Sequence, residues 1–196
     1  MVHENAEVAG KLEFVARGVD RLHEWGKGQR IVWNCIECTR IANVNVKPTP
    51  AQVRSEVWMA LIHGSQGLIY FVHQFRPKFI EPGLLADEEM AKAVGEINRQ
   101  ISGLASVLNS PTLTEAVRVT SSEDKVLVDA MTKRTQDATY VFAVCMRNHP
   151  TRATFTCKQT TLAKAEVLGE DRALTLNHGV FTDEFAPYAV HLYRLK

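Results

Sequence analysis

The sequence predicts two regions of different fold class, an α/β region over residues 1–110 and an antiparallel β region over residues 111–196. Before Pro111, helical and strand patterns alternate, which is typical of parallel strands joined by right-handed helical crossovers. After Pro111, short strand-like runs are separated by polar turns, which is typical of a β-sandwich. The chain has 196 residues, 45% of them hydrophobic, so it is long enough for two small cores.

The α/β region opens with a predicted helix over Ala6–Trp25, because apolar residues recur along it at helical spacing. Gly26 and Gly28 end this helix. The run Arg30–Ile36 is short and nearly continuously apolar, as expected of a parallel strand that is covered on both faces. This interpretation places Trp33 in the core.

A second helix and a second strand follow. Thr49 can cap the helix, a proline suits its first turn, and Gln52 completes a capping box. Gly64 ends this helix, and Gly67–Val72 is predicted to be a second buried strand. After a loop rich in proline and aromatic residues, Asp87 is predicted to cap a long third helix.

Two parallel strands do not form a stable sheet by themselves, since both edges stay open and both faces need cover. Three helices around two strands therefore make an incomplete layer. Either other chains supply the missing strands, or this region is the end of a larger α/β domain. We adopt the second interpretation.

The antiparallel region contains seven predicted short strands. Alternation of apolar and polar residues is clearest in Ala153–Cys157 and in Val190–Tyr193. Residues 179–188 are predicted to form an ordered corner, in which Asp183 caps backbone amides while nearby aromatic residues plug the edge of the sandwich. The seven strands are Ala116–Ser121, Val126–Thr132, Thr139–Arg147, Arg152–Cys157, Ala165–Leu168, Arg172–Leu176 and Ala189–Leu195, and the aromatic residues of the corner are Phe181, Phe185 and Tyr188.

Charge and hydropathy argue against some classes of partner. The 23 basic and 22 acidic residues give a net charge of +1 without any block of like charge, so we expect no nucleic acid or membrane partner. The apolar run Gly67–Val72 is far too short to span a bilayer. The first residues, Met1–Asn5, lack the basic and apolar parts of a signal peptide. The localisation of the parent protein stays open, and secretion or export to the periplasm is compatible with this sequence.

Cys35 and Cys38 form a C-x-x-C pair, a spacing that redox and zinc sites use. A redox pair normally opens a helix, whereas this pair lies at the end of an apolar strand. The other two cysteines, Cys145 and Cys157, lie too far along the chain to complete a zinc site at short spacing. We therefore interpret the cysteines as small buried hydrophobic residues, and we expect no metal and no cofactor.

Glu37 follows the first predicted strand directly. In a parallel α/β barrel, the carboxyl ends of the strands form the mouth in which substrate binds. A carboxylate there is well placed as the nucleophile of a glycosidase, or as the electrostatic stabiliser of an oxocarbenium-like state. The alternative is a rim carboxylate that pairs with Arg40 or with solvent, and position alone does not decide between the two.

Four further candidate side chains follow the second predicted strand, as Glu37 follows the first. His73 and Gln74 could hydrogen-bond sugar hydroxyls, and Phe75 or Phe79 could offer a ring face to a sugar. The alternative is a histidine whose hydrogen bonds go to the backbone, surrounded by packed aromatic residues.

Parts of the sequence resemble a known family. Pro48–Arg54, together with Trp58–Phe71, resembles the seventh helix and eighth strand of many barrel glycoside hydrolases, including β-galactosidase-like enzymes of the retaining barrel clan. The end of the chain, from Glu166–Glu170 to Val190–Tyr193, is similar to the small β-sandwich that closes such enzymes. The resemblance covers nearly the whole chain after the first helix.

The resemblance implies the last βα units of an incomplete (β/α)8 barrel, strands 7 and 8 with their flanking helices, followed by a small antiparallel β-sandwich. The strand Ile31–Ile36 then corresponds to the seventh strand, whose end carries the nucleophilic glutamate in the retaining clan, here Glu37. The family's general acid lies at the end of the fourth strand, and this chain has no candidate for that strand.

The expected function is therefore that of the carboxy-terminal portion of a glycoside hydrolase acting on O-glycosidic bonds of an oligo- or polysaccharide. The chain alone is expected to be inactive, because retaining hydrolysis uses two carboxyl groups about 5 Å apart. Carbohydrate is the expected partner. The alternatives are a non-catalytic carbohydrate-binding or packing sandwich, and a barrel remnant that self-associates through its open edges.

Overall fold

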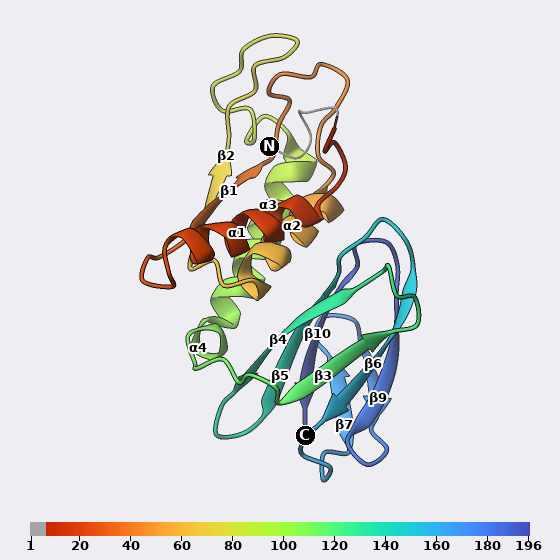
Figure 1. Ribbon diagram of the computed structural model, residues 1–196. Coiled ribbons are helices and arrows are strands. Elements are labelled where there is room, and N and C mark those ends of the chain that lie inside the picture. The colour runs from red at the N-terminus through yellow and green to blue at the C-terminus, as the bar shows by residue number, and fades with distance from the viewer. Residues whose placement is uncertain (1–6) are drawn as a thin grey trace. The chain divides into compact units, whose positions relative to one another are not determined.

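The structure is a computed structural model that describes residues 7–196, and Figure 1 shows its elements in chain order. The chain divides into two compact units, the first ending at Ser102 and the second running from Gly103 to Lys196. The division lies somewhat before the sequence-based boundary at Pro111. Within residues 7–196, no helix combines the length and the apolar character that crossing a membrane requires.

The first unit alternates helices and strands, as the sequence predicts. The first described helix begins at Glu13, later than predicted, while Ala6 lies outside the described residues. The elements are α1 (Glu13–Trp25), β1 (Trp33–Glu37), α2 (Pro50–Ile62), β2 (Gly67–Phe71) and α3 (Glu88–Gly103), which ends at the boundary between the units.

Side-chain caps fix the starts of α2 and α3, as predicted. The Gln52 backbone amide donates to Thr49 Oγ1 at 3.2 Å, and the Thr49 amide donates to Gln52 Oε1 at 2.8 Å, which completes the capping box. After α2, Gly64 adopts a left-handed φ of +98°, which ends the helix. At the start of α3, Asp87 Oδ1 accepts from the Met90 amide at 3.1 Å.

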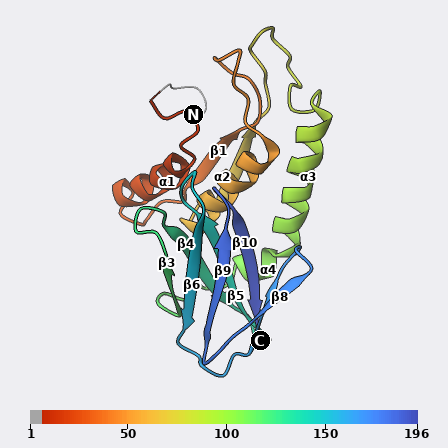
Figure 2. The same ribbon diagram turned by 90° about the vertical axis from the view of Figure 1, so that its right-hand side faces the viewer.

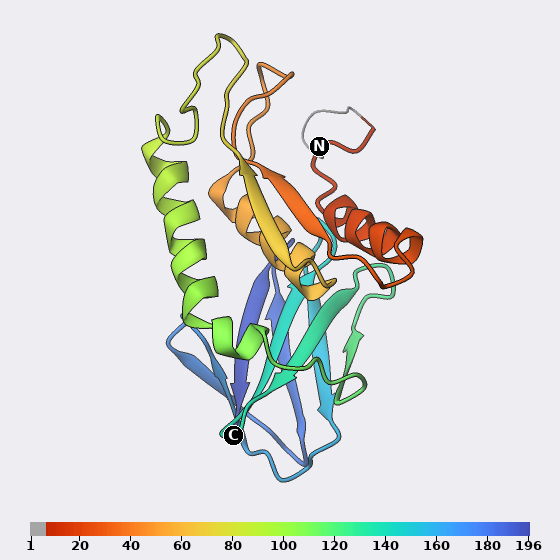
Figure 3. The same ribbon diagram turned by 90° about the vertical axis from the view of Figure 1, so that its left-hand side faces the viewer.

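The two strands of the first unit pair in parallel, with the register running from Trp33 opposite Gly67 to Glu37 opposite Phe71. Figure 3 shows them side by side in front of α2. Side chains alternate between the two faces of such a sheet. The face that carries Ile36, Leu68 and Tyr70 packs on the helices, where it meets Val53 and Val57 of α2 and Met90, Val94 and Ile97 of α3.

The opposite face of this sheet is open, which corrects the prediction that β1 is covered on both faces. Trp33 is 58% exposed and Ile69 is 48% exposed, and Cys35 between them is exposed as well. The prediction that Trp33 lies in the core is therefore wrong. The continuous apolar run of this strand predicts a covering layer on each face of the sheet. The described residues supply helices on one face alone.

Glycine at position 67 makes room for the Trp33 side chain. A Cβ atom at Gly67 would lie 2.6 Å from ring atoms of Trp33, so the indole ring packs directly over the backbone of the neighbouring strand. Any side chain at this position would displace the ring.

The second unit is an antiparallel β-sandwich, as predicted for this region. One sheet has the strand order β4-β5-β10-β7-β8 and the other has the order β3-β6-β9, and Figure 2 shows strands of both. A short helix, α4 (Ala105–Leu108), precedes them. The strands are β3 (Val117–Ser121), β4 (Val128–Arg134), β5 (Thr139–Cys145), β6 (Thr151–Cys157), β7 (Lys164–Val167), β8 (Arg172–Thr175), β9 (Val180–Phe185) and β10 (Val190–Leu195).

The seven predicted strands are present with shifted ends, and β9 is an eighth that the sequence interpretation treated as a corner. In β9 the buried residues Phe181, Asp183 and Phe185 alternate with exposed Thr182 and Glu184. This is the period-two pattern of a half-buried strand. An acidic residue at an inward position hides the pattern, because Asp183 breaks the apolar sequence that identifies strands.

The sandwich core is built around aromatic rings from both sheets. The rings of Phe155 on β6 and Phe181 on β9 stack in parallel with centroids 4.6 Å apart. Tyr193 on β10, in the other sheet, meets each of them edge-on at 5.2 Å. Phe185 approaches Phe155 at 6.2 Å. These separations are those of favourable aromatic pairs, so the rings bind the two sheets together.

Candidate functional site

Glu37 lies at the carboxyl end of the parallel sheet, where the barrel interpretation places a catalytic carboxylate. It is the last residue of β1 and pairs in register with Phe71, the last residue of β2. By alternation it shares the face of Trp33 and Cys35. Unlike those two residues it is buried, with 3% of its surface exposed. The loops that follow β1 and β2 leave the sheet at this same end (Figure 3).

The loop that follows β2 is tied to the loop that follows β1. Thr39 Oγ1 donates to the His73 carbonyl at 2.6 Å, and the Phe75 amide donates to the Arg40 carbonyl at 2.9 Å. Gln74 forms a two-way backbone bridge with Ile80, at 3.0 and 2.9 Å. The backbone around the predicted sugar-binding residues is therefore ordered by hydrogen bonds.

The imidazole of His73 has a defined orientation. Its Nδ1 lies 2.8 Å from the Glu81 carbonyl, which can only accept, so Nδ1 carries the proton. In the neutral ring this leaves Nε2 as an acceptor. A histidine in this state can accept a hydrogen bond from a sugar hydroxyl.

Four aromatic side chains gather at the end of β2 and in the loop after it, and we call them the mouth cluster: Phe71, which pairs in register with Glu37, and His73, Phe75 and Phe79. The ring of Phe71 lies 6.0 Å from that of His73 and 6.1 Å from that of Phe75. Phe79 lies 6.1 Å from His73 and 5.5 Å from Phe75. Phe75 is 45% exposed and Phe79 is 60% exposed. The cluster therefore presents aromatic surface to solvent, which suits contact with the apolar face of a sugar ring.

The base of this loop allows no side chain at Gly83. A Cβ atom there would lie 2.7 Å from the Gln74 amide nitrogen and 3.0 Å from the Val72 carbonyl oxygen. At the next position, the Leu84 amide donates to the same Val72 carbonyl at 2.9 Å. The returning loop is thus pressed against the backbone that carries His73 and Gln74.

Gly83→Ala is expected to destabilise the first unit by about 1–3 kcal/mol, the usual cost of forcing extra atoms into a packed site. The clash is with backbone atoms, which do not move aside as a flexible side chain does. Urea unfolding followed by tryptophan fluorescence measures this, since all three tryptophans lie in the first unit.

Gly18→Ala is the matched control for this substitution. Gly18 lies in α1, and a Cβ atom there would meet nothing within 4 Å. Alanine is therefore expected to stabilise the helix by about 0.5–1 kcal/mol. An unchanged urea midpoint for Gly83→Ala would contradict the tight packing of the loop.

The structure brings most of the predicted site residues together, although their roles stay predictions. Glu37 lies at the end of β1 opposite Phe71, and the ring of Phe71 belongs to the same cluster as His73, Phe75 and Phe79. Gln74 lies in the same loop, where its backbone forms a bridge with Ile80. The sequence interpretation missed Phe71 and Thr39. Alternation could have identified Phe71, because residues 71, 73 and 75 are two positions apart and so point to the same side of an extended chain.

A second carboxylate for acid catalysis is not evident in the two loops. Asp87 caps α3 and forms an ion pair with Lys47. Burial alone would raise the pKa of Asp87, but hydrogen bonds from Lys47 and from the Met90 amide lower it below its ordinary value. Glu81 is exposed on the loop. Asp87 is therefore an ionised structural residue, unsuited to donate a proton.

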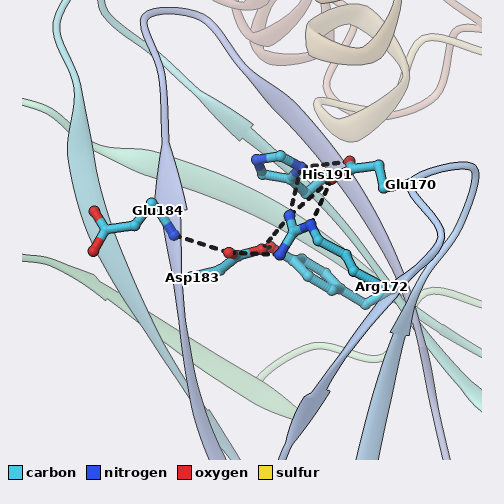
Figure 4. A network of polar contacts seen from close by, with 6 residues as sticks. Glu170, Arg172, Asp183, Glu184 and His191 are labelled. Carbon is cyan, nitrogen blue, oxygen red and sulfur yellow. Dashed lines mark hydrogen bonds and ion pairs between the residues drawn. The ribbon is translucent and has the colours of Figure 1, made fainter.

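A polar network joins the two sheets of the sandwich (Figure 4). Arg172 on β8 donates to both carboxylate oxygens of Asp183 on β9, at 2.8 Å each. The Tyr193 hydroxyl on β10 donates to Asp183 Oδ2 at 2.8 Å. Since β9 belongs to one sheet and β8 and β10 to the other, Asp183 links the sheets.

The outer part of this network is built on Glu170. Its Oε2 accepts from Arg172 Nε at 2.9 Å, and its Oε1 accepts from His191 Nδ1 at 2.6 Å. Asp183 also accepts from the Glu184 amide at 2.9 Å, so the predicted backbone cap is present, as one contact among several. Each carboxylate of the network is paired with Arg172, so we interpret the network as a structural clamp between the sheets.

The interpretation of the cysteines as small buried residues is confirmed for three of the four and is wrong for Cys35. Cys38, Cys145 and Cys157 are buried, Cys35 is exposed, and all four are free. Burial raises the pKa of each thiol above its ordinary value, to about 12 for Cys38. A raised pKa keeps the reactive thiolate scarce. Within residues 7–196, no group of three or more histidine, cysteine or acidic side chains could hold a metal ion.

Comparison with known proteins identifies the fold and no more. Neither a family model nor a curated protein matches the sequence. Several solved structures match the chain, among them three α-amylases. The enzyme from Geobacillus thermoleovorans, complexed with acarbose, has a TM-score of 0.63 at 12% identity and is matched by 94% of this chain. An Anoxybacillus α-amylase gives 0.62 at 9% identity over 98% of the chain, and a maltogenic α-amylase from Thermotoga neapolitana gives 0.55 at 9% identity over 91%.

The chain spans about half the length of these structures, covering 46%, 46% and 45% of them respectively. The mixed fold of helices and antiparallel sheets is thus the fold of one part of larger glycoside hydrolases.

Proposed function

We propose that this chain is the carboxy-terminal portion of a glycoside hydrolase that acts on O-glycosidic bonds of an oligo- or polysaccharide. The observation that carries the proposal is the position of Glu37 at the carboxyl end of β1, beside Phe71 and the rest of the mouth cluster. The fold shared with part of several α-amylases supports it. Glu37 then acts as nucleophile or as stabiliser of the oxocarbenium-like state, and the mouth cluster and Gln74 contact the sugar.

Hydrolysis of the glycosidic bond requires a second carboxyl group to protonate the leaving oxygen, and in a retaining site this group lies about 5 Å from the first. Among the described residues of the two loops, Asp87 is committed to Lys47 and to the α3 cap, and Glu81 lies exposed. The proposed enzyme therefore takes its general acid from strands that this chain does not contain.

The chain alone is expected to hydrolyse aryl glycosides no faster than buffer does. The physical reason is that a lone carboxylate lacks the proton donor for the leaving group. Release of nitrophenol from a panel of aryl glycosides measures this. Turnover that disappears in Glu37→Gln but persists in the matched variant Glu81→Gln would contradict the expected inactivity while supporting the role of Glu37.

Sugar binding is the direct test on the chain as it exists. Phe79→Ala is expected to weaken binding of a sugar probe by about 0.5–1.5 kcal/mol, the scale of an aromatic contact, which is roughly two- to tenfold in Kd. Lactose and acarbose are suitable probes, with saturation-transfer NMR as the measurement. They distinguish a galactosidase-like from an amylase-like preference.

Leu85→Ala is the control for the binding test, since Leu85 is another exposed apolar residue of the same loop segment and lies outside the mouth cluster. Binding that is equally strong in wild type and Phe79→Ala would remove the mouth cluster from the proposed site. Absence of binding to any sugar probe would count against the proposed function itself.

The alternative of a carbohydrate-binding sandwich requires a row of exposed aromatic side chains on that unit. In residues 103–196 every phenylalanine and tyrosine side chain is buried or half-buried. The exposed aromatic residues Trp25, Trp33, Phe75 and Phe79 all belong to the first unit. This distribution favours the hydrolase proposal over the module.

A further inference from the structure

A cavity of about 570 Å³ lies in the second unit, at the end of the sandwich where β4 turns into β5. Residues 134–139 of this hairpin line it, together with Gln159 and Leu162 from the connection between β6 and β7. The end of β10, marked C in Figure 2, contributes Leu195 and Lys196. We call it the hairpin cavity. Sites for small organic molecules have volumes of about 300–1,000 Å³, so this cavity is large enough for one.

The strand ends around the hairpin cavity are ordered by pairing. Thr139 on β5 and Leu195 on β10 lie opposite each other in register, and both are buried. The Lys196 amide donates to the Lys164 carbonyl at 3.0 Å, and the Lys196 carbonyl accepts from the Ala163 amide at 2.8 Å. The backbone that carries the lining residues of β5 and β10 is therefore fixed by hydrogen bonds.

The guanidinium of Arg134 is held in the hairpin cavity by two uncharged groups. Its Nε donates to Thr139 Oγ1 at 3.2 Å, and its Nη2 donates to Gln159 Oε1 at 3.4 Å. Among the described residues, no carboxylate forms an ion pair with this guanidinium. Arginine has five N–H donors, and these two contacts use two of them. The side chain therefore has a defined position, a positive charge that no carboxylate balances, and donors left for a further acceptor.

The tip of the hairpin adds backbone donors to the same lining. Within the part of the chain that the structure describes, the amides of Gln136, Asp137 and Ala138 donate to no backbone carbonyl. Lys196 adds an ammonium group. Backbone amides beside cationic side chains are the donors by which proteins bind oxyanions. The donors of the hairpin cavity are therefore suited to a carboxylate or a phosphate group.

The charges of the lining favour an anion. Of the described residues that line the cavity, Arg134 and Lys196 are cationic and Asp137 is acidic. Glu166 on β7, which is not part of the lining, is engaged by Arg194 through contacts of 3.0 and 2.5 Å. The lining therefore carries a net positive charge that attracts an anion, and Asp137 weakens this attraction.

We propose that the hairpin cavity binds a small organic oxyanion, a molecule that carries a carboxylate or phosphate group together with an apolar part. The oxyanion accepts from Arg134 and from the amides of residues 136–138, and Lys196 adds charge attraction. The apolar part packs on Leu162 and Leu195. This site does not rest on the proposed function, because all of its lining residues belong to the second unit.

The experiment is a proton–nitrogen NMR titration of the whole chain with phenyl phosphate, benzoate and the neutral benzyl alcohol. Both anions are expected to shift the amide signals of residues 135–138, and their relative affinities decide between phosphate and carboxylate. Benzyl alcohol is expected to leave these signals unchanged. Inorganic phosphate, which lacks the apolar part, is expected to bind about threefold more weakly than phenyl phosphate, or weaker still. Added sodium chloride should weaken the binding of both anions, because salt screens exposed charges.

Arg134→Gln is expected to weaken binding of phenyl phosphate by about tenfold or more, the scale of a hydrogen bond to a charged group. Arg118→Gln is the matched control, because Arg118 is exposed on β3 and does not line the cavity. Asp137→Asn is expected to strengthen binding by about two- to threefold, since it removes the negative charge from the lining. A gain of this kind does not arise from damage to the fold.

Several results would overturn this anion site. The amide signals of residues 135–138 could fail to respond to either anion, or the affinity could be the same in Arg134→Gln as in Arg118→Gln. Benzyl alcohol that binds as tightly as phenyl phosphate would make the cavity an apolar site instead. Inorganic phosphate that binds as tightly as phenyl phosphate would replace the organic ligand with the bare oxyanion. An Asp137→Asn variant with unchanged affinity would show that the charge of the lining does not govern binding.

Discussion

Asp183→Ala is expected to lower the free energy of unfolding of the sandwich by about 3–5 kcal/mol, the cost of removing one partner from a buried ion pair. The carboxylate is 7% exposed and accepts from Arg172 twice and from Tyr193 once. Its loss leaves the buried Tyr193 hydroxyl without its acceptor and leaves Arg172 with Glu170 as its remaining carboxylate partner. Urea unfolding followed by far-UV circular dichroism measures the effect, and tryptophan fluorescence reports separately on the first unit.

Glu184→Ala is the matched control on the same strand. Glu184 faces outward and pairs with Arg152, and both side chains are more than 60% exposed, at 68% and 63%. Exposed pairs of this kind contribute less than about 1 kcal/mol. Equal urea midpoints for the two variants would show that the clamp on Asp183 contributes no more than a surface contact.

The stabilisation by Asp183 also depends on pH. Burial alone would raise the pKa of Asp183, but hydrogen bonds from Arg172 and Tyr193 outweigh it and lower the pKa below the ordinary 3.8. A carboxyl group with a lowered native pKa stabilises the fold fully above its unfolded pKa and loses this effect as pH falls through the native pKa. The difference in stability between wild type and Asp183→Asn should therefore shrink below about pH 3.8.

Phe155→Ala is expected to have an effect of similar size, about 3–5 kcal/mol, which is usual for truncating a buried phenylalanine. Its ring stacks on Phe181 at 4.6 Å and contacts Phe185 and Tyr193, so its removal leaves a cavity between the sheets. The same urea titration measures it, and the sandwich is expected to unfold at lower urea while the fluorescence of the first unit is unchanged.

Thr156→Ala tests whether position in β6 alone explains the loss. Thr156 is the next residue on the same strand and is exposed, so alanine there should cost less than about 1 kcal/mol. Phe155→Leu, which keeps most of the apolar volume, should lie between the two variants. A Phe155→Ala variant as stable as Thr156→Ala would contradict the aromatic core described here.

The elements that the sequence predicted best carry local signals. The capping box at Thr49 and the cap at Asp87 each depend on residues within three positions of one another, and both are present. Alternation in β6 likewise survives in the structure as alternating burial. Such patterns can be recognised from the sequence because the residues that interact lie close together along the chain.

The elements that were missed depend on distant partners. β9 escaped recognition because Asp183, a charged residue, faces inward, and its partner Arg172 lies on a strand of the other sheet. Trp33 was assigned to the core because an apolar run gives no information on which of its faces is covered. Tertiary context decides both cases, and a single sequence does not contain it.

The candidate site was predictable in position and not in detail. Placement of Glu37 and His73 after two apolar strands followed from the rule that parallel strands end at one edge. The mouth cluster did not, because it forms through a bridge between Gln74 and Ile80 that folds Phe79 back toward Phe75. That fold-back is a property of the loop as a whole.

The last described strand, β10, lies between β5 and β7 in the middle of its sheet. When the ribosome has synthesised the chain only as far as β9, both neighbours of β10 are therefore present, and the strand that pairs with both of them is not. Pairing between β5 and β10 spans a long stretch of sequence, and contacts of this kind form late and slowly. During synthesis, the half-finished sandwich exposes two unpaired strand edges, and these are the surfaces at which aggregation begins.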